Sequence, residues 1–245
     1  MLFTPATTLI APAAVGGAWT GPTSGITSQW WLDDSHVSGT TISDSGSNNN
    51  TGTAAGGVTS ASSPAGAFYS TARAFDGVVG TGITLASSVL NWTSSFTLAM
   101  WVYVVDITAA GSGGFRATFF YSALSDSTHY IRVLNDTNLA AGVIDFEFNA
   151  QGAARSSASS SAVLVNNTWA HVGVTYDTTT ITLYVNGSSV STQNSSIGDA
   201  SSSAVAFIGD HQAITTGDPN GRMYNIVLYN RALSSGEMST LFSAK

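Results

Sequence analysis

The sequence predicts a single all-β domain, folded as a mostly antiparallel sandwich of two sheets. Three observations predict it. The 245-residue chain holds 25 glycines, only 9% charged residues and much Ser and Thr, so strong helix formers are scarce. Short segments of alternating apolar and polar residues recur along the chain, with turn residues between them. A hydrophobic content of 43% is enough to fill the space between two sheets.

The N-terminal segment, residues 1–27, shows no sustained hydrophobic period and contains Pro5, Pro12 and Pro22. We therefore expect an extended arm here and the sandwich domain at 28–245. The arm fits a signal peptide poorly because no Lys or Arg precedes its apolar stretch. No apolar run in the chain reaches the roughly 20 residues that a membrane span needs.

Several apolar residues of this arm would be exposed, because the segment is too rich in Pro and Gly to form a core of its own. We expect them to dock on a partner, either a capsid subunit or a subunit of another assembly. The proposed docking residues are Leu2, Phe3, Leu9, Ile10 and Trp19.

The first strands of the domain are short. We expect a strand at Gln29–Leu32, a rim loop over 43–50 with a dense Asp, Ser, Gly and Asn content, and a strand that ends in a tight turn over Arg73–Gly77. The next strand is expected at Gly82–Leu85.

The clearest strand is Phe96–Val105, which alternates with period two. Trp101 and Tyr103 fall on the second face, so both faces are apolar and the strand should be central. The residues of the first face are Phe96, Leu98, Met100, Val102 and Val104.

An antiparallel meander and two hairpins are expected in the second half of the chain. The meander strands are Ala117–Tyr121, His129–Leu134 and Val143–Phe148. The hairpin strands are Trp169–Tyr176, Thr180–Asn186 and Val190–Gln193. Asn186-Gly187 predicts a type I′ turn, in which both central residues need positive φ. The Ser- and Ala-rich segments 156–162 and 200–204 are expected to be loops.

One helix is predicted at the C-terminal end. Ser234 and Glu237 have the spacing of a capping box, and Met238, Leu241 and Phe242 then fall on one side. The helix should lie against the sandwich.

In their order and spacing, these segments resemble the laminin-G-like, concanavalin A-like jelly-roll family over roughly 28–245. The likeness rests on a Trp strand that leads into the loop 43–50, on Phe75-Asp76-Gly77, and on the Trp strand from Phe96. Further along it rests on Trp169–Asp177, on Leu183–Gly187, on Ile208-Gly209, and on Tyr229–Ser234 with Glu237. The resemblance implies a two-sheet antiparallel jelly roll and roles in glycan or protein recognition, adhesion or virion surfaces.

The resemblance also implies a structural calcium, for which Asp44 and Asp76 are the weak candidates here. The last strand departs from the family pattern, because Asn225 stands where an acidic residue is common. No cofactor is otherwise expected.

Catalysis has little support in the sequence. The glucanase motif of three alternating acids is matched only by Asp145 and Glu147, with Val143 where the nucleophile must be. We expect both acids on the solvent face of a strand. The four histidines show no metal-ligand spacing, and no Gly-x-Ser-x-Gly elbow is present. His171 should be a packed or surface histidine.

The net charge of −7 leaves no basic stripe for nucleic acid, and the absence of cysteine excludes disulfides and thiolate metal sites. The first function expected is a non-catalytic coat or surface-binding protein at the virion surface, such as a phage capsid decoration or fibre protein. We expect this protein to form a homo-oligomer within its assembly and to contact glycans. The alternative is a free carbohydrate-binding or adhesion module, extracellular or on a cell surface. A degenerate glycoside hydrolase ranks third.

Overall fold

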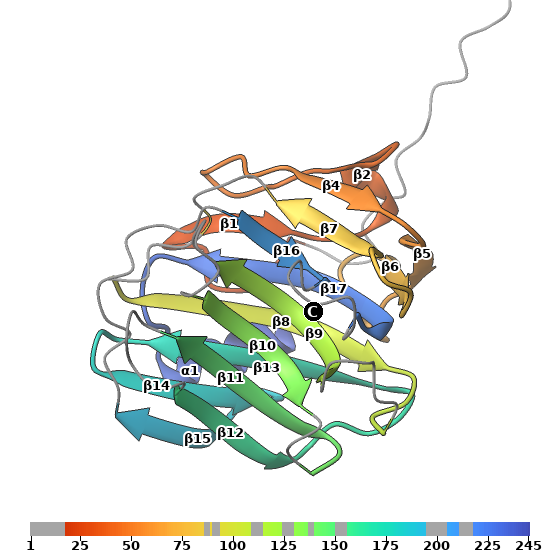
Figure 1. Ribbon diagram of the computed structural model, residues 1–245. Coiled ribbons are helices and arrows are strands. Elements are labelled where there is room, and N and C mark those ends of the chain that lie inside the picture. Colours follow the sequence, from red (N-terminus) through yellow and green to blue (C-terminus); the bar gives the residue numbers. More distant parts are fainter. Residues whose placement is uncertain are drawn as a thin grey trace, which may run out of the picture.

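The computed structural model describes residues 18–85, 89, 94–108, 115–123, 130–136, 140–149, 156–194, 205–210 and 218–245. Its strands form two stacked sheets, and every pairing between described strands is antiparallel (Figure 1). The predicted all-β jelly-roll sandwich is therefore confirmed.

Sheet A has eight strands in the order β15-β14-β13-β8-β17-β6-β5, with β1 beside β17. Their bounds are β1 Ile26–Trp30, β5 Thr59–Ser62, β6 Thr71–Asp76, β8 Phe96–Val104, β13 Thr168–Tyr176, β14 Thr180–Val185, β15 Ser188–Asn194 and β17 Asn220–Tyr229. The long strand predicted from Phe96 is β8, at the centre of this sheet. The predicted first strand begins earlier than expected and ends at Trp30.

Sheet B has nine strands in the order β12-β11-β10-β9-β16-β7-β4-β3-β2. Their bounds are β2 Val37–Ser38, β3 Thr41–Ile42, β4 Gly52–Ala55, β7 Gly82–Leu85, β9 Phe115–Ala123, β10 Tyr130–Asp136, β11 Val143–Asn149, β12 Ser156–Ala162 and β16 Val205–Ile208. The meander β9-β10-β11 is as predicted.

The prediction of a loop over 156–162 is wrong. These residues form β12, which pairs with β11 in a register that includes Asp145 with Ser159. A run of Ser and Ala carries little strand propensity, but the exposed edge of β11 supplies a template of backbone hydrogen bonds. The other Ser-rich segment, 200–204, lies outside the described residues.

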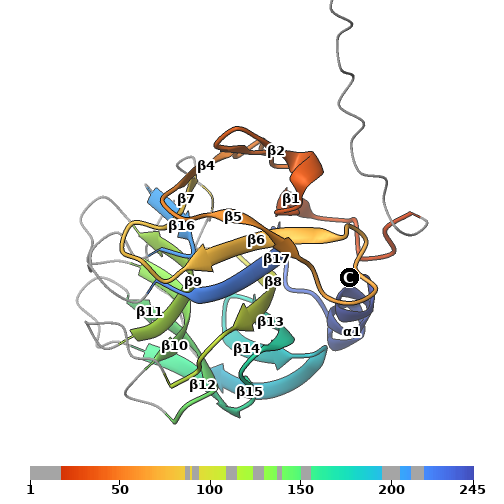
Figure 2. The same ribbon diagram turned by 90° about the vertical axis from the view of Figure 1, so that its right-hand side faces the viewer.

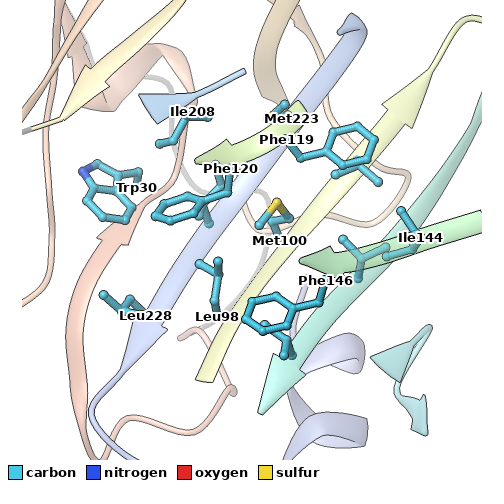
Figure 3. Close-up of a cluster of buried hydrophobic side chains, with 14 of the residues drawn as sticks. Trp30, Leu98, Met100, Phe119, Phe120, Ile144, Phe146, Ile208, Met223 and Leu228 are labelled. Carbon is cyan, nitrogen blue, oxygen red and sulfur yellow. The ribbon is translucent and has the colours of Figure 1, made fainter. Parts of the chain in front are cut away.

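The core lies between the two sheets and consists of the inward side chains of both (Figure 3). In Figure 3, Trp30, Leu98, Met100, Met223 and Leu228 come from sheet A and meet Phe119, Phe120, Ile144, Phe146 and Ile208 from sheet B. The first face of β8 lies in this core, as its alternation predicts.

The predicted helix is α1, Ser235–Ser243, with Ser234 as N-cap and the full capping box in place. Figure 2 shows α1 on the outer side of sheet A, opposite to sheet B. Gly173 of β13 makes this close approach possible, because a Cβ there would lie 2.5 Å from Cε of Met238. A short 3₁₀ helix, η1 (Asp34–His36), follows β1. No helix in the described ranges is long and apolar enough to cross a membrane.

The described end of the predicted arm, residues 18–27, contacts the sandwich, and β1 begins within it at Ile26. Trp19 packs edge-on against Trp31 with ring centroids 5.7 Å apart, and its indole N–H donates to the carbonyl of Ala244. Gly21 has no side chain to block this ring, since a Cβ there would lie 2.2 Å from it. Trp19 is thus half-buried against its own domain. Leu2, Phe3, Leu9 and Ile10 lie outside the described residues.

Candidate functional site

The outer face of sheet A carries a block of aromatic rings on its two central strands. Because side chains alternate along β8, Trp101 and Tyr103 point away from the core. The register with β13 sets His171 opposite Trp101 and Trp169 opposite Tyr103. The corresponding ring centroids are 5.3 Å and 5.5 Å apart, so the rings are in contact.

The last turn of α1 covers one end of this block. Phe242 stacks on Trp101 with centroids 5.5 Å apart and an interplanar angle of 26°. Met238 and Leu241 are buried beneath the helix and fix its position on the sheet. Trp101 and His171 are consequently buried, whereas Tyr103 and Trp169 keep part of their rings in solvent.

A groove of about 330 Å³ opens where the buried Trp101 meets the partly exposed Trp169. The chain turns 64–65 and 186–187 and the end of α1 form its walls. The side chains that give it its chemistry are Trp101, Thr168, Trp169, Asn186, Phe242 and Lys245. The groove thus combines aromatic surface with an amide, a hydroxyl and an amine, a combination typical of small-molecule sites.

The turn at Asn186 is built by the sequence as predicted. Asn186 and Gly187 have φ values of 49° and 78°, as a type I′ turn requires. The Asn186 side-chain oxygen accepts a hydrogen bond of 2.9 Å from the backbone N–H of His171. The amide is therefore held at the rim of the groove by the adjacent strand.

Two polar atoms beneath the groove have no hydrogen-bond partner in the described structure. They are Nε1 of Trp101 and Nδ1 of His171, both shielded from solvent. Burial lowers the pKa of His171 to about 3, so its imidazole is neutral near pH 7. Of the two placements expected for His171, packed or on the surface, the structure shows the packed one, against Trp101 and Phe242.

The calcium candidates do not form a common site. Both Asp44 side-chain oxygens accept backbone N–H groups at 2.7 Å, from Gln29, Gly46 and Asn50, so this carboxylate organises the loop 43–50. These three donors occupy most of the roughly four lone-pair sites of the carboxylate, so little capacity remains for a cation.

The other two calcium positions also have structural partners. Asp76 accepts from Val78 and Thr81 at the end of β6. Asn225 has positive φ, interrupts β17 and accepts from the Gln29 side chain. Within the described ranges no group of three or more His, Cys, Asp or Glu residues could hold a metal ion. The residues of the proposed calcium site do not fit that ion.

The placement expected for the two strand acids is wrong. Asp145 is 4% exposed and Glu147 is 1% exposed, so neither lies on an open solvent face. Asp145 accepts a hydrogen bond of 2.7 Å from the Ser159 hydroxyl of β12, the strand that the sequence did not predict. Val143, at the nucleophile position of the glucanase motif, lies on the same strand and is buried as well.

The groove residues were not identified as a site from the sequence. One signal was present, because β8 and β13 carry aromatic residues on the face that the core does not use. Phe242, Asn186 and Lys245 reach the same place only through the packing of α1 and the β14-β15 turn, which no local pattern encodes.

Comparisons with known proteins agree with this architecture. Residues 75–239 match the family described as the concanavalin A-like lectin/glucanases superfamily. No curated protein sequence matches the chain.

Solved structures share the fold at low sequence identity. One is domain 4 of AbnA, an extracellular GH43 arabinanase from Geobacillus stearothermophilus, which was solved in complex with arabinotriose. It is 16% identical in sequence and has a TM-score of 0.69, and the match covers 89% of this chain and 98% of that domain. The receptor-binding domain of botulinum neurotoxin D is 13% identical, with a TM-score of 0.65 over 89% of this chain and 52% of that one.

A third similar structure is the sialidase of Trypanosoma rangeli in complex with 2,3-difluorosialic acid. It is 18% identical, with a TM-score of 0.63 over 90% of this chain and 33% of the enzyme. This chain thus corresponds to about half of the toxin domain and a third of the sialidase. Because the family match spans most of the sandwich, the chain belongs to the concanavalin A-like lectin/glucanase superfamily.

Proposed function

We propose that the chain is a non-catalytic carbohydrate-binding module that holds a sugar chain in the groove beside α1. The observation that carries this proposal is the half-exposed Trp169 ring, which lines the groove together with Thr168 and Asn186. The apolar face of a sugar ring packs on an aromatic surface, and its hydroxyls bond to nearby amides and hydroxyls.

The rigidity of the groove supports the same proposal. Its floor belongs to paired strands and its walls to a capped helix and a tight turn, so little side-chain and loop freedom would be lost on binding. The arabinanase domain that shares the fold was solved with a trisaccharide, which makes glycan recognition a reasonable expectation for a groove of this size.

The binding experiment uses a glycan array followed by titration calorimetry on the glycans that bind. Trp169→Ala should lower affinity at least about tenfold, because the stacking surface is lost. Phe68→Ala is the matched control: Phe68 is also a half-buried aromatic residue near this face, but it packs on Trp31 outside the groove. Equal losses in both variants, or no glycan bound by the wild type, would refute the proposal.

The proposal that the module is not an enzyme rests on Val143, which cannot attack an anomeric carbon as a carboxylate can. We expect no release of reducing sugar from any bound glycan. Hydrolysis by the wild type that disappears in Glu147→Gln would contradict this.

A second proposed function is a structural role on a virion, as a decoration or fibre subunit at its surface. It is favoured by the 9% content of charged residues, because a surface with few charges loses little solvation on dense packing with neighbours. The chain would then occur in purified particles at a fixed, stoichiometric copy number. Under the carbohydrate-binding proposal alone, we place the module outside the cell or on its surface.

A further inference from the structure

The four basic residues whose side chains the structure describes divide into two kinds. Arg73 and Arg231 each contact a carboxylate, that of Asp34 and that of Glu237. Arg222 and Lys245 instead lie over aromatic rings and contact no carboxylate among the described residues.

Both of these cations border the aromatic block of sheet A. The Lys245 ammonium lies 5.7 Å from the centroid of Trp101, at the end that α1 covers. The Arg222 guanidinium lies 4.7 Å from the centroid of Tyr103, which itself contacts Trp169. Lys245 therefore lines the groove that we propose for sugar binding, and Arg222 lies beside it, over a ring that contacts Trp169.

The surroundings leave this positive charge available to a ligand. Arg222 donates one hydrogen bond, of 2.7 Å, to the hydroxyl of Ser62, and its fork has further donors. The residues that line the groove include no Asp or Glu. A guanidinium and an ammonium both bind carboxylate and sulfate by charge-assisted hydrogen bonds, which are about twice as strong as neutral ones.

We propose that the groove prefers acidic saccharides, meaning sugar chains that carry carboxylate or sulfate groups, over their neutral parents. This inference rests on the proposed carbohydrate-binding function and names the class of sugar. The rings of Trp101 and Trp169 supply the surface for the sugar, and Lys245 and Arg222 supply the charge selection.

The experiment compares matched glycans on one array: uronate- and sialate-containing chains, sulfated chains, and the neutral parent of each. The wild type should bind acidic glycans at least about tenfold more tightly than their parents at low salt, and the preference should shrink at about 0.5 M salt. The carboxylate and sulfate arms identify which anion is preferred.

Variants assign the preference to the two cations. Arg222→Gln, outside the groove lining, should reduce affinity for acidic glycans about fivefold to tenfold and leave neutral glycans unaffected. Lys245→Gln, within the lining, should reduce affinity for acidic glycans more than for their neutral parents. Thr53→Glu, on exposed β4 of the other sheet, lowers the net charge by the same amount and should change neither.

The possible outcomes separate the two proposals. Equal binding of acidic and neutral glycans, with loss in Trp169→Ala, would overturn the acidic preference and leave the carbohydrate-binding function standing. No glycan binding that depends on Trp169 would overturn both. If Thr53→Glu reduced the preference for acidic glycans as much as Arg222→Gln does, the preference would come from the net charge of the whole protein. That result would also overturn the proposal.

Discussion

The indole N–H of Trp19 donates a hydrogen bond of 2.7 Å to the carbonyl of Ala244, which lies 225 positions further along the chain. Nearby, the Asn230 N–H donates to the carbonyl of Gly25 at 2.9 Å, and the Tyr229 hydroxyl donates to the carbonyl of Pro22 at 2.8 Å. The segment before β1 is thereby held to the last strand and to the end of α1, so it contributes to the stability of the sandwich.

Trp19→Ala should lower the free energy of unfolding by about 2 kcal/mol, since a half-buried ring and its hydrogen bond are both lost. Trp19→Phe keeps the ring contact and should cost about 1 kcal/mol. Chemical denaturation measures both. A chain that begins at Ser28 should be clearly less stable than one that begins at Ala18. Equal midpoints for these two chains would show that the contacts of residues 18–27 contribute nothing.

The capping box of α1 gives a second prediction. Ser234 accepts from the Glu237 N–H while the Glu237 carboxylate accepts from the Ser234 N–H and from Arg231. Ser234→Ala should cost about 1 kcal/mol of unfolding free energy. Thr240→Ala, an exposed change in the same helix, is the control and should cost less. An unchanged midpoint for Ser234→Ala would contradict the capping assignment.

Glu237 also makes the stability depend on pH. The hydrogen bonds from Arg231 and from the Ser234 backbone lower the pKa of Glu237 from 4.5 to about 2. A depressed carboxyl pKa stabilises the folded state above the unfolded pKa, and this contribution is lost as the pH falls from about 5 toward 2. Glu237→Gln should reduce the acid sensitivity of the melting temperature in that window. A variant that loses stability with acid as steeply as the wild type would refute this assignment.

His171 gives a pH dependence in a higher window. The pKa of His171 is about 3 in the folded state and about 6.5 in the unfolded state. Below pH 6.5 the unfolded state therefore binds a proton at this residue that the folded state does not bind. Stability should therefore fall with acid below about pH 6.5, by roughly 1 to 2 kcal/mol from this group down to pH 5. His171→Phe should remove this part of the slope, as measured by urea unfolding at several pH values. Parallel slopes for both proteins would show that His171 is not the group responsible.

Gly187 gives a prediction with a close internal control. A Cβ at Gly187 would lie 3.1 Å from Cα of Ser239 and from Cβ of Phe242, so Gly187→Ala should push on α1 at the wall of the groove. Gly39 also has positive φ, but nothing lies within 4 Å of a Cβ there. Gly39→Ala should cost about 1 kcal/mol from backbone strain alone, and Gly187→Ala should cost more and weaken glycan binding. An equal loss of unfolding free energy in the two variants would show that α1 moves away from the new methyl group at no energetic cost.

Sequence reasoning predicted the fold better than the site, for physical reasons. β8 could be predicted because its alternation is local, and α1 because Ser234 and Glu237 are three residues apart. β12 could not, because a run of Ser becomes a strand only when β11 offers its edge. The groove unites β8, β13, a turn and the end of α1, and its composition depends on tertiary packing. The burial of Asp145 and Glu147 is likewise a property of the folded sheet and not of the strand pattern.

The edge strands β12 and β15 close the same side of the sandwich (Figure 1) and are built almost wholly from Ser, Thr, Ala, Asn and Gln. Proteins commonly protect such edges from joining other sheets with Lys, Pro or inward charges, none of which these strands contain. Here the edges carry uncharged hydroxyls and amides in their place. Such groups do not titrate and are not screened by ions, so the tendency of these edges to associate should change little with acidity or salinity.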